Sequence, residues 1–122
     1  MPLLSEVKMV KKDWFIKAGE LKQLLRWKEA SGCFATDRIM VDGCKVGYMY
    51  REEPDNDIDS GWRFLAGDED DDYMDNIGNM GIFDLNTIAN YDVDIIPFLH
   101  SDYGSAFYRD NNGTFQKDVL DF

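Results

Sequence analysis

The spacing of the apolar residues changes about a quarter of the way along the chain, and this change limits the folds open to it. Before the change, Leu21, Leu24 and Leu25 follow the i, i+3, i+4 spacing of a helix with one apolar stripe. We therefore predict a helix over about residues 19–31, with a start as early as Asp13 as the alternative. The chain must then place one amphipathic helix against whatever follows it.

After the change, the pattern becomes typical of strands. Two runs, Phe34–Val41 and Cys44–Tyr50, are separated by Asp42-Gly43, a dipeptide favoured in two-residue hairpin turns. The second run continues to Pro54, which ends a strand because it has no N–H to donate. A third strand is expected over Gly61–Gly67, and antiparallel pairing with the second is the simplest arrangement.

The third strand alternates in character. Trp62 and Phe64 fall on one face, and Arg63 falls on the other. Arg63 has two interpretations of equal weight: it is a buried ion-pair partner of Glu52 or Glu53, or it has a functional role.

The C-terminal half carries further short elements. Asp84 and Asp92 suit the N-caps of two short helical segments. The expected elements are a strand over 80–83, helical segments over 85–90 and 93–99, and a hairpin of 104–109 with 114–118. A chain of 122 residues can bury one core. The predicted fold class is α+β: a single domain with an N-terminal helix, a mainly antiparallel sheet of about five to six strands, and short helices between strands.

Charge is unevenly spread along the chain. The formal net charge is −11, but residues 1–30 carry seven basic and four acidic side chains while residues 31–122 carry six and twenty. The two parts therefore have net charges of +3 and −14. We expect a basic helical segment over 1–32 and the main domain over 33–122, with the segment docked on its own acidic domain or mediating a homodimer.

The acidic balance excludes some partners and favours others. Nucleic acids and anionic membrane surfaces are poor partners, because phosphate is bound mostly through Lys and Arg. A basic protein is the expected partner, since opposite fields steer association; the alternative is that the charge only maintains solubility. A cytoplasmic location is expected, because no apolar signal-peptide region is present and Cys33 and Cys44 are predicted to be free thiols.

The sequence contains no clear catalytic or metal-binding motif. Both dense acidic runs fail the EF-hand spacing, at the Gly and the Glu positions, although nonspecific cation binding by either loop stays open. His100 lies beside Ser101 and Asp102, but three consecutive residues cannot converge as a catalytic triad. We expect no catalytic residues, no metal site and no cofactor. A small enzyme that uses carboxylates or a metal, with Arg63 placing an anion, is kept as an alternative.

We predict instead a protein-binding face, in which two acidic loops, 52–59 and 68–75, flank an aromatic patch. Aromatic anchors within a charged rim are typical of tight interfaces. Core packing is the alternative for each aromatic residue, and it is at least as strong for Trp62. The candidate residues are Tyr48, Tyr50, Glu52, Glu53, Asp55, Asp57, Asp59, Trp62, Arg63, Asp68, Glu69, Asp70, Asp71 and Asp72.

Five blocks of the sequence resemble a known family in their order and spacing. They are Val46–Pro54, Asp59–Phe64, Gly67–Glu69, Asp84–Asn90 and Gly104–Phe107. The resemblance, over about residues 33–116, is to a small bacterial family first catalogued as a domain of unknown function and then grouped with immunity protein thirty-three of polymorphic toxin systems. It implies a cytoplasmic α+β domain that neutralises a toxin, and it brings no catalytic residues. A housekeeping or regulatory domain that binds an endogenous partner is the other function considered.

Overall fold

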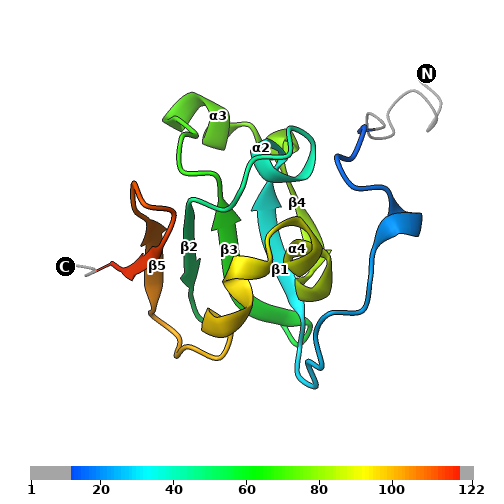
Figure 1. Ribbon diagram of the computed structural model, residues 1–122, viewed down its shortest axis with the longest axis vertical. Helices are drawn as coiled ribbons and strands as arrows, with labels where there is room; N and C mark the ends of the chain where they lie inside the picture. The colour runs from blue at the N-terminus through cyan, green and yellow to red at the C-terminus, as the bar shows by residue number, and fades with distance from the viewer. Residues whose placement is uncertain (1–11, 119–122) are drawn as a thin grey trace.

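The computed structural model describes residues 12–118, and within them the chain forms one mixed, mostly antiparallel sheet of six strands (Figure 1). The strands lie in the order β4-β1-β3-β2-β5-β6. Their bounds are β1 Gly32–Thr36, β2 Tyr48–Arg51, β3 Asp59–Leu65, β4 Met80–Asp84, β5 Ala106–Arg109 and β6 Phe115–Lys117. One pair, β1 with β3, is parallel, and the other four pairs are antiparallel. The predicted fold class, apart from its N-terminal helix, is confirmed.

The helical elements are short, and α4 lies in front of β1 in Figure 1. They are η1 Ala18–Glu20, α2 Asp37–Met40, α3 Asp71–Asp75, η2 Ile77–Asn79, α4 Leu85–Tyr91 and η3 Val93–Phe98. The predicted caps are confirmed: the Asp84 carboxylate accepts a hydrogen bond from the N–H of Asn86, and that of Asp92 from the N–H of Asp94. The predicted β5–β6 hairpin is also present.

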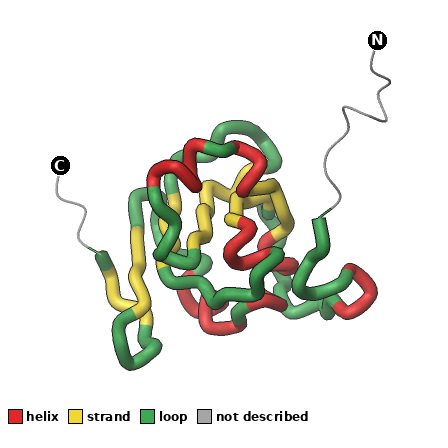
Figure 2. Tube along the Cα trace, turned by 90° about the horizontal axis from the view of Figure 1, so that it is seen from above, coloured by secondary structure: helices red, strands yellow, loops and turns green. Residues whose placement is uncertain are grey.

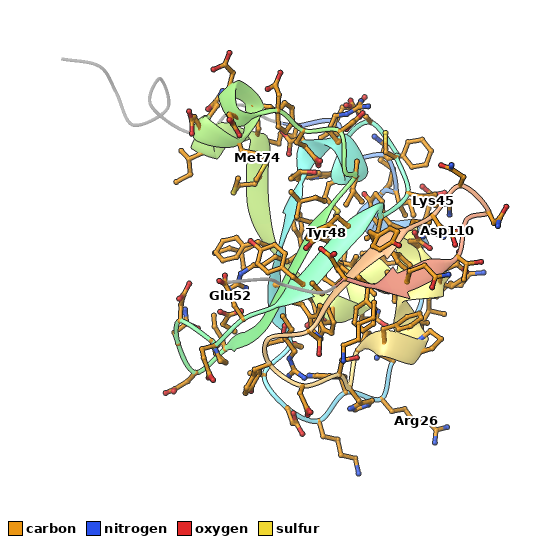
Figure 3. The ribbon with its side chains drawn as sticks, turned by 90° about the vertical axis from the view of Figure 1, so that its left-hand side faces the viewer. Arg26, Lys45, Tyr48, Glu52, Met74 and Asp110 are labelled. Atoms are coloured by element: carbon orange, nitrogen blue, oxygen red, sulfur yellow. The ribbon has the colours of Figure 1, made fainter. Side chains whose placement is uncertain are left out.

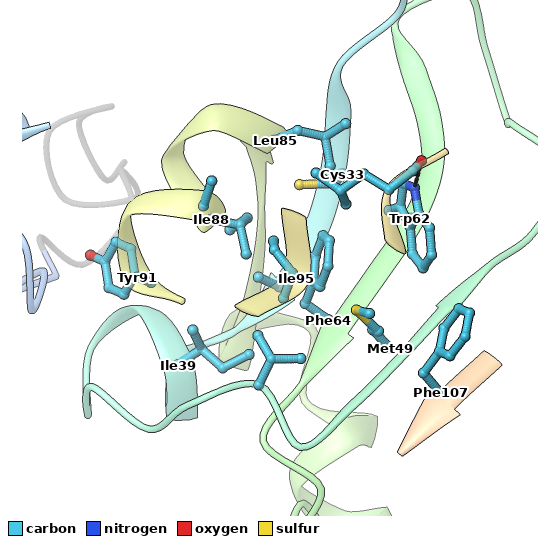
Figure 4. Packing of buried hydrophobic residues seen from close by; sticks show 14 of the residues in the cluster. Cys33, Ile39, Met49, Trp62, Phe64, Leu85, Ile88, Tyr91, Ile95 and Phe107 are labelled. Atoms are coloured by element: carbon cyan, nitrogen blue, oxygen red, sulfur yellow. Dashed lines mark hydrogen bonds between the residues drawn. The ribbon is translucent and has the colours of Figure 1, made fainter. Parts of the chain in front are cut away.

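The core lies between one face of the sheet and the pair α4 and η3 (Figure 4). Trp62 and Phe64 of β3 and Met49 of β2 point into it, where they meet Ile88 of α4 and Ile95 of η3. All five side chains are almost fully buried. Truncating such a side chain typically costs about 2–5 kcal/mol of stability.

The predicted hairpin of 34–41 with 44–50 is wrong, because α2 intervenes and β1 and β2 are not neighbours. Gly43 adopts the left-handed conformation (φ 79°), and its N–H donates to the carbonyl of Ile39 at 3.1 Å. This is the C-terminal end of a helix rather than a hairpin turn. Asp-Gly is compatible with a hairpin turn and with the end of a helix. The helix forms here because it buries Ile39 and Met40 against the core.

The predicted N-terminal helix is also wrong. Within residues 12–31 the one helical turn is η1, and residues 21–28 form neither helix nor strand. Their main-chain groups bond to side chains of α4 rather than to one another: the N–H groups of Leu24 and Leu25 donate to Asn86 Oδ1 at 2.7 and 3.0 Å. Figures 1 and 2 both show this segment on the side of the molecule opposite the C-terminal hairpin. The domain boundary near residue 32 stays a prediction.

Candidate binding face

The sheet face opposite α4 and η3 carries partly exposed aromatic and aliphatic side chains, and we call it the open face. The strand registers place them in two neighbouring rows. One row runs from Ile82 of β4 through Phe34 of β1 and Arg63 of β3 to Tyr50 of β2. The other joins Leu65 of β3, Tyr48 of β2 and Tyr108 of β5. Ile82 is 67% exposed and Tyr108 43%, while Phe34, Tyr48, Tyr50 and Leu65 are half-buried.

Arg63 lies at the centre of the open face and is almost fully buried. Its two Nη atoms donate to both carboxylate oxygens of Asp59 at 2.9 and 2.8 Å, and its Nε donates to Glu52 at 2.6 Å. The Asp55 carboxylate lies 3.6 Å away, and the Phe34 ring packs on the guanidinium at 4.6 Å. The predicted pairing of Arg63 with Glu52 is thus confirmed, and its guanidinium is held by groups of its own chain.

Asp59 is the anionic centre of this network. Besides the two bonds from Arg63, its carboxylate accepts the N–H groups of Asp55 and Gly61, each at 2.9 Å. The hydrogen bonds from Arg63, aided by these N–H groups, hold the pKa of Asp59 well below its usual range against the opposing effect of burial. Asp59 therefore stays ionised, and it fixes the acidic loop 52–59 to the sheet.

The two acidic loops lie at opposite ends of the strands that form the open face. In Figure 3, Met74 of α3 and Glu52 lie on the same side of the sheet, above and below Tyr48. At the upper end a groove of about 530 Å³ is lined by Tyr48, Leu65 and Tyr108 together with Asp68, Glu69 and Arg109. Tyr48 and Tyr50 thus lie between the two acidic loops, and the binding role of this face stays a prediction.

Several of the acidic candidate residues have structural partners. Asp68 forms an ion pair with Arg38, and the Asp70 carboxylate caps α3 by accepting from the N–H of Tyr73 at 2.8 Å. Glu69 accepts from the N–H groups of Ala66 and Gly67, each at 2.8 Å. These carboxylates hold the loop in place, as Asp59 and Glu52 do at the other end.

Four of the predicted acidic residues differ from these because their carboxylates have no partner among the described residues. Within residues 12–118 they are exposed and form no hydrogen bond or ion pair through their carboxylates: Glu53, Asp57, Asp71 and Asp72. Their charge is available to a partner. Position in the sequence gave no means of separating them from Asp68, Asp70 or Glu69, because all belong to the same two runs.

Trp62 does not belong to the open face. It is fully buried on the opposite side of β3, where its Nε1–H donates to the carbonyl of Leu99 at 3.0 Å. Tyr50 is paired with Arg63 in the register, and Trp62 is paired with Arg51, so Trp62 and Tyr50 point to opposite faces. The core alternative considered for Trp62 is the correct one.

Sequence reasoning missed four members of the open face: Phe34, Leu65, Ile82 and Tyr108. The alternation of β3 already placed Leu65 on the face of Arg63. Phe34, Ile82 and Tyr108 lie next to these residues only because β1, β4 and β5 pair as they do, and no local pattern states which strands are neighbours.

The carboxylates considered for an enzyme border two different hollows. Asp55 and Asp59 border one of about 30 Å³, and Glu52 and Glu53 border one of about 480 Å³ together with Tyr50 and Tyr103. No group of three His, Cys, Asp or Glu side chains among residues 12–118 is arranged to hold a metal ion. In the same part of the chain, no helix has the length and apolar character needed to cross a bilayer.

The comparisons with known proteins give a family for most of the chain. Residues 33–119 match the family described as Immunity protein Imm33 domain. Neither the search of curated proteins nor the search of solved structures gave a significant match.

Proposed function

The chain belongs to the Imm33 family of immunity protein domains, and we propose that it binds and neutralises a basic toxin domain through its open face. An immunity protein of this kind occupies the active site of its toxin or a surface beside it. The proposal includes a bacterial polymorphic toxin system as the setting and the cytoplasm as the place where binding occurs.

The observation that supports this most is the combination of the open face with carboxylates that have no partner. Tyr48, Tyr50 and Tyr108 offer apolar rings with polar ends, which are typical anchors of protein interfaces. The Tyr48 hydroxyl already donates to Asp118 at 2.8 Å, and burial, together with this bond, raises the pKa of Tyr48 to about 12. The Tyr48 side chain would therefore meet a partner as a neutral phenol.

The charge of the rim favours a basic partner. Nuclease toxins are basic where they hold phosphate, and a surface with Glu53, Asp57, Asp71 and Asp72 presents carboxylates that such a site attracts. Carboxylates already engaged by the chain's own cations and N–H groups contribute less, since their charge is partly neutralised.

The test is charge reversal at the carboxylates without partners. We would measure by calorimetry the affinity of Asp71→Lys/Asp72→Lys for the toxin domain encoded beside this gene, produced in catalytically inactive form. Replacing attraction with repulsion at the rim should weaken binding about 10–100-fold. Asp13→Lys/Glu20→Lys is the control, because it makes the same change of charge at two exposed sites outside both loops. An unchanged affinity in the double variant would contradict the proposal.

A second pair of variants tests the aromatic anchors. Tyr50→Ala and Tyr108→Ala should each weaken binding by about tenfold or more if these rings are buried against the toxin. Val93→Ala is the control, since Val93 is also exposed but lies on η3, on the other side of the sheet. Equal losses for Val93 and the tyrosines would place the interface elsewhere.

The gene neighbourhood separates this function from binding of an endogenous partner. An adjacent reading frame that encodes a basic toxin-like domain supports immunity. Its absence, with capture of a housekeeping protein through the same face, would favour the regulatory alternative.

A further inference from the structure

Residues 12–31 lie outside the family match, yet they are bound closely to the domain, and we call them the strap. We infer that the outer side of α4 is a peptide site that recognises the main chain of a segment without regular secondary structure. The strap occupies this site in cis, and the same segment of a second copy of the chain can take its place.

The recognition is made by two asparagines one helical turn apart on α4. Asn90 Oδ1 accepts the N–H of Lys22 at 2.9 Å, and the Nδ2 groups of Asn90 and Asn86 donate to the carbonyl of Lys22 at 2.9 and 2.8 Å. Asn86 Oδ1 also accepts the N–H groups of Leu24 and Leu25. Asn90 is itself oriented by a 2.8 Å bond from its Nδ2 to the carbonyl of Asn86. We call these two side chains the asparagine clamp.

The asparagine clamp contacts main-chain groups, so it does not depend on the side chain at the position that it binds. The Lys22 side chain is exposed and forms no ion pair within residues 12–118. One side chain nearby is selected: Leu25 is 8% exposed and joins the core cluster. The site therefore fits a segment of irregular main chain with an apolar residue three positions after the clamped residue.

Two further anchors hold the strap on either side of the clamp. The Tyr91 hydroxyl accepts the N–H of Ile16 at 3.0 Å. At the other end, the Trp27 ring stacks on His100 with 4.7 Å between centroids. Charge has a small part, since Lys12 with Asp37 is the ion pair that joins the strap to the rest of the described chain. The basic character of the segment is thus not what docks it.

The last residues of the strap form a short linker to β1, which is exposed at Lys28 and Glu29. From Ser31 onward the chain is fixed again, because the Ser31 carbonyl accepts the N–H of Leu85 at 2.8 Å. The strap thus resembles a peptide ligand tied to its receptor by a short linker, which is the arrangement that permits exchange between copies.

The experiment cuts this linker in the folded, full-length protein. A protease site inserted after Glu29 is cleaved, and the nicked protein is mixed with excess fluorescent peptide of residues 12–29. Anisotropy and native mass spectrometry then follow the exchange. We expect the strap fragment to stay bound after cleavage and to be replaced by one labelled peptide per protein.

Modified peptides test whether the main chain is recognised, and they need no change in the protein. N-methylation at Leu24 removes an N–H that the clamp accepts and should weaken binding about tenfold or more. N-methylation at Lys28 and the replacement Lys22→Ser are the matched controls, and both should change the affinity by less than about twofold. Asn86→Ala in the protein should reproduce the loss seen with the Leu24 peptide.

Two results would overturn the inference. One is release of the strap fragment on cleavage with no binding of the labelled peptide. The other is equal binding of the Leu24-methylated and unmodified peptides. Neither readout involves a toxin, so this experiment and the test of the open face succeed or fail separately.

Discussion

Arg63 connects the acidic loop 52–59 to the sheet through one guanidinium. Its Asp59 partner is 6% exposed at the side chain and its Glu52 partner 51%. The two ion pairs therefore contribute differently to the stability of the fold. A buried carboxylate depends on its cation, whereas an exposed one can return to water at little cost.

Replacing Arg63 with alanine should lower the free energy of unfolding by about 3–5 kcal/mol, because Asp59 is left buried without a cation. Glu52→Gln, which removes the exposed partner, should cost less than about 1 kcal/mol. Urea denaturation of both variants checks this. A cost for Arg63→Ala no larger than that of Glu52→Gln would show that Asp59 finds water or another donor.

The same pair predicts how stability depends on pH. The pKa of Asp59 is lowered in the folded state, chiefly by the hydrogen bonds from Arg63, so between the two pKa values the unfolded state binds more protons. The stabilisation is present above the unfolded value of about 4 and is lost as the pH falls through the folded value. The free energy of unfolding should therefore decrease below about pH 4, and less steeply in Asp59→Asn. Equal slopes for the two proteins in acid denaturation would contradict the assignment.

At the scale of elements, the start of β3 is shaped by a close approach of two main chains. Gly61 has a φ of 90°, and a Cβ placed on it would lie 2.1 Å from the carbonyl oxygen of Glu52. The N–H of Glu52 donates to the carbonyl of Gly61 at 2.9 Å. The acidic loop 52–59 is thus closed by main-chain contact as well as by Arg63.

Gly61→Ala should destabilise the protein by more than about 3 kcal/mol, since the unfavourable φ adds to a clash with main-chain atoms that cannot rotate away. Gly104→Ala is the matched control: its φ is 93°, but its Cβ would meet no atom within 4 Å. The free energy of unfolding of that variant should fall by about 1 kcal/mol, because only the unfavourable φ contributes and no clash is added. Thermal unfolding of both proteins measures the difference, and similar losses would mean that the loop moves to accept the methyl group.

The elements also differ in how well local patterns predict them. The hairpin of β5 and β6 and the capped segments α4 and η3 were predicted, because their signals act over a few residues. The Asp-Gly turn and the strap were misjudged for the opposite reason. Asn86 bonds to Lys22 across 64 positions of sequence, and such contacts outweigh a weak helical spacing.

Across the whole molecule, the net charge of −11 overstates the charge that a partner meets. Asp59, Asp92 and Glu69 are engaged by the chain's own donors, and Arg38, Arg63 and Arg109 each contact two or more carboxylates. The remaining field comes from exposed acids at the ends of the open face, including Asp71 and Asp72.

This distribution predicts a kinetic signature for toxin binding. The association rate with a basic partner should fall about tenfold or more between low and high salt, while the dissociation rate changes little, because steering is screened and buried contacts are not. Stopped-flow measurements at several salt concentrations check it. A salt-independent association rate would indicate that the apolar part of the open face governs the encounter.

The candidate site was predictable in part. The two acidic loops and the tyrosines of β2 were named from sequence, and they do lie at the ends and in the middle of one sheet face. Trp62 was named among the binding residues with core packing as an equally strong alternative, and the structure shows the alternative; Tyr108 was missed. A one-residue step along a strand reverses the face, so Trp62 and Arg63 cannot share one, and the neighbours of a strand are set by pairing across the sheet.

The sequence by itself determined the α+β class, the positions of the capped helices and the C-terminal hairpin, and the concentration of acidic charge in two loops. These follow from caps, turns and alternation, which act between residues close in the chain. The tertiary structure alone decided that β1 lies beside β3, that residues 21–28 form no helix, which sheet face stays open, and which carboxylates lack a partner within residues 12–118. Those outcomes depend on contacts between residues far apart in sequence, where burial and hydrogen bonding outweigh local preference.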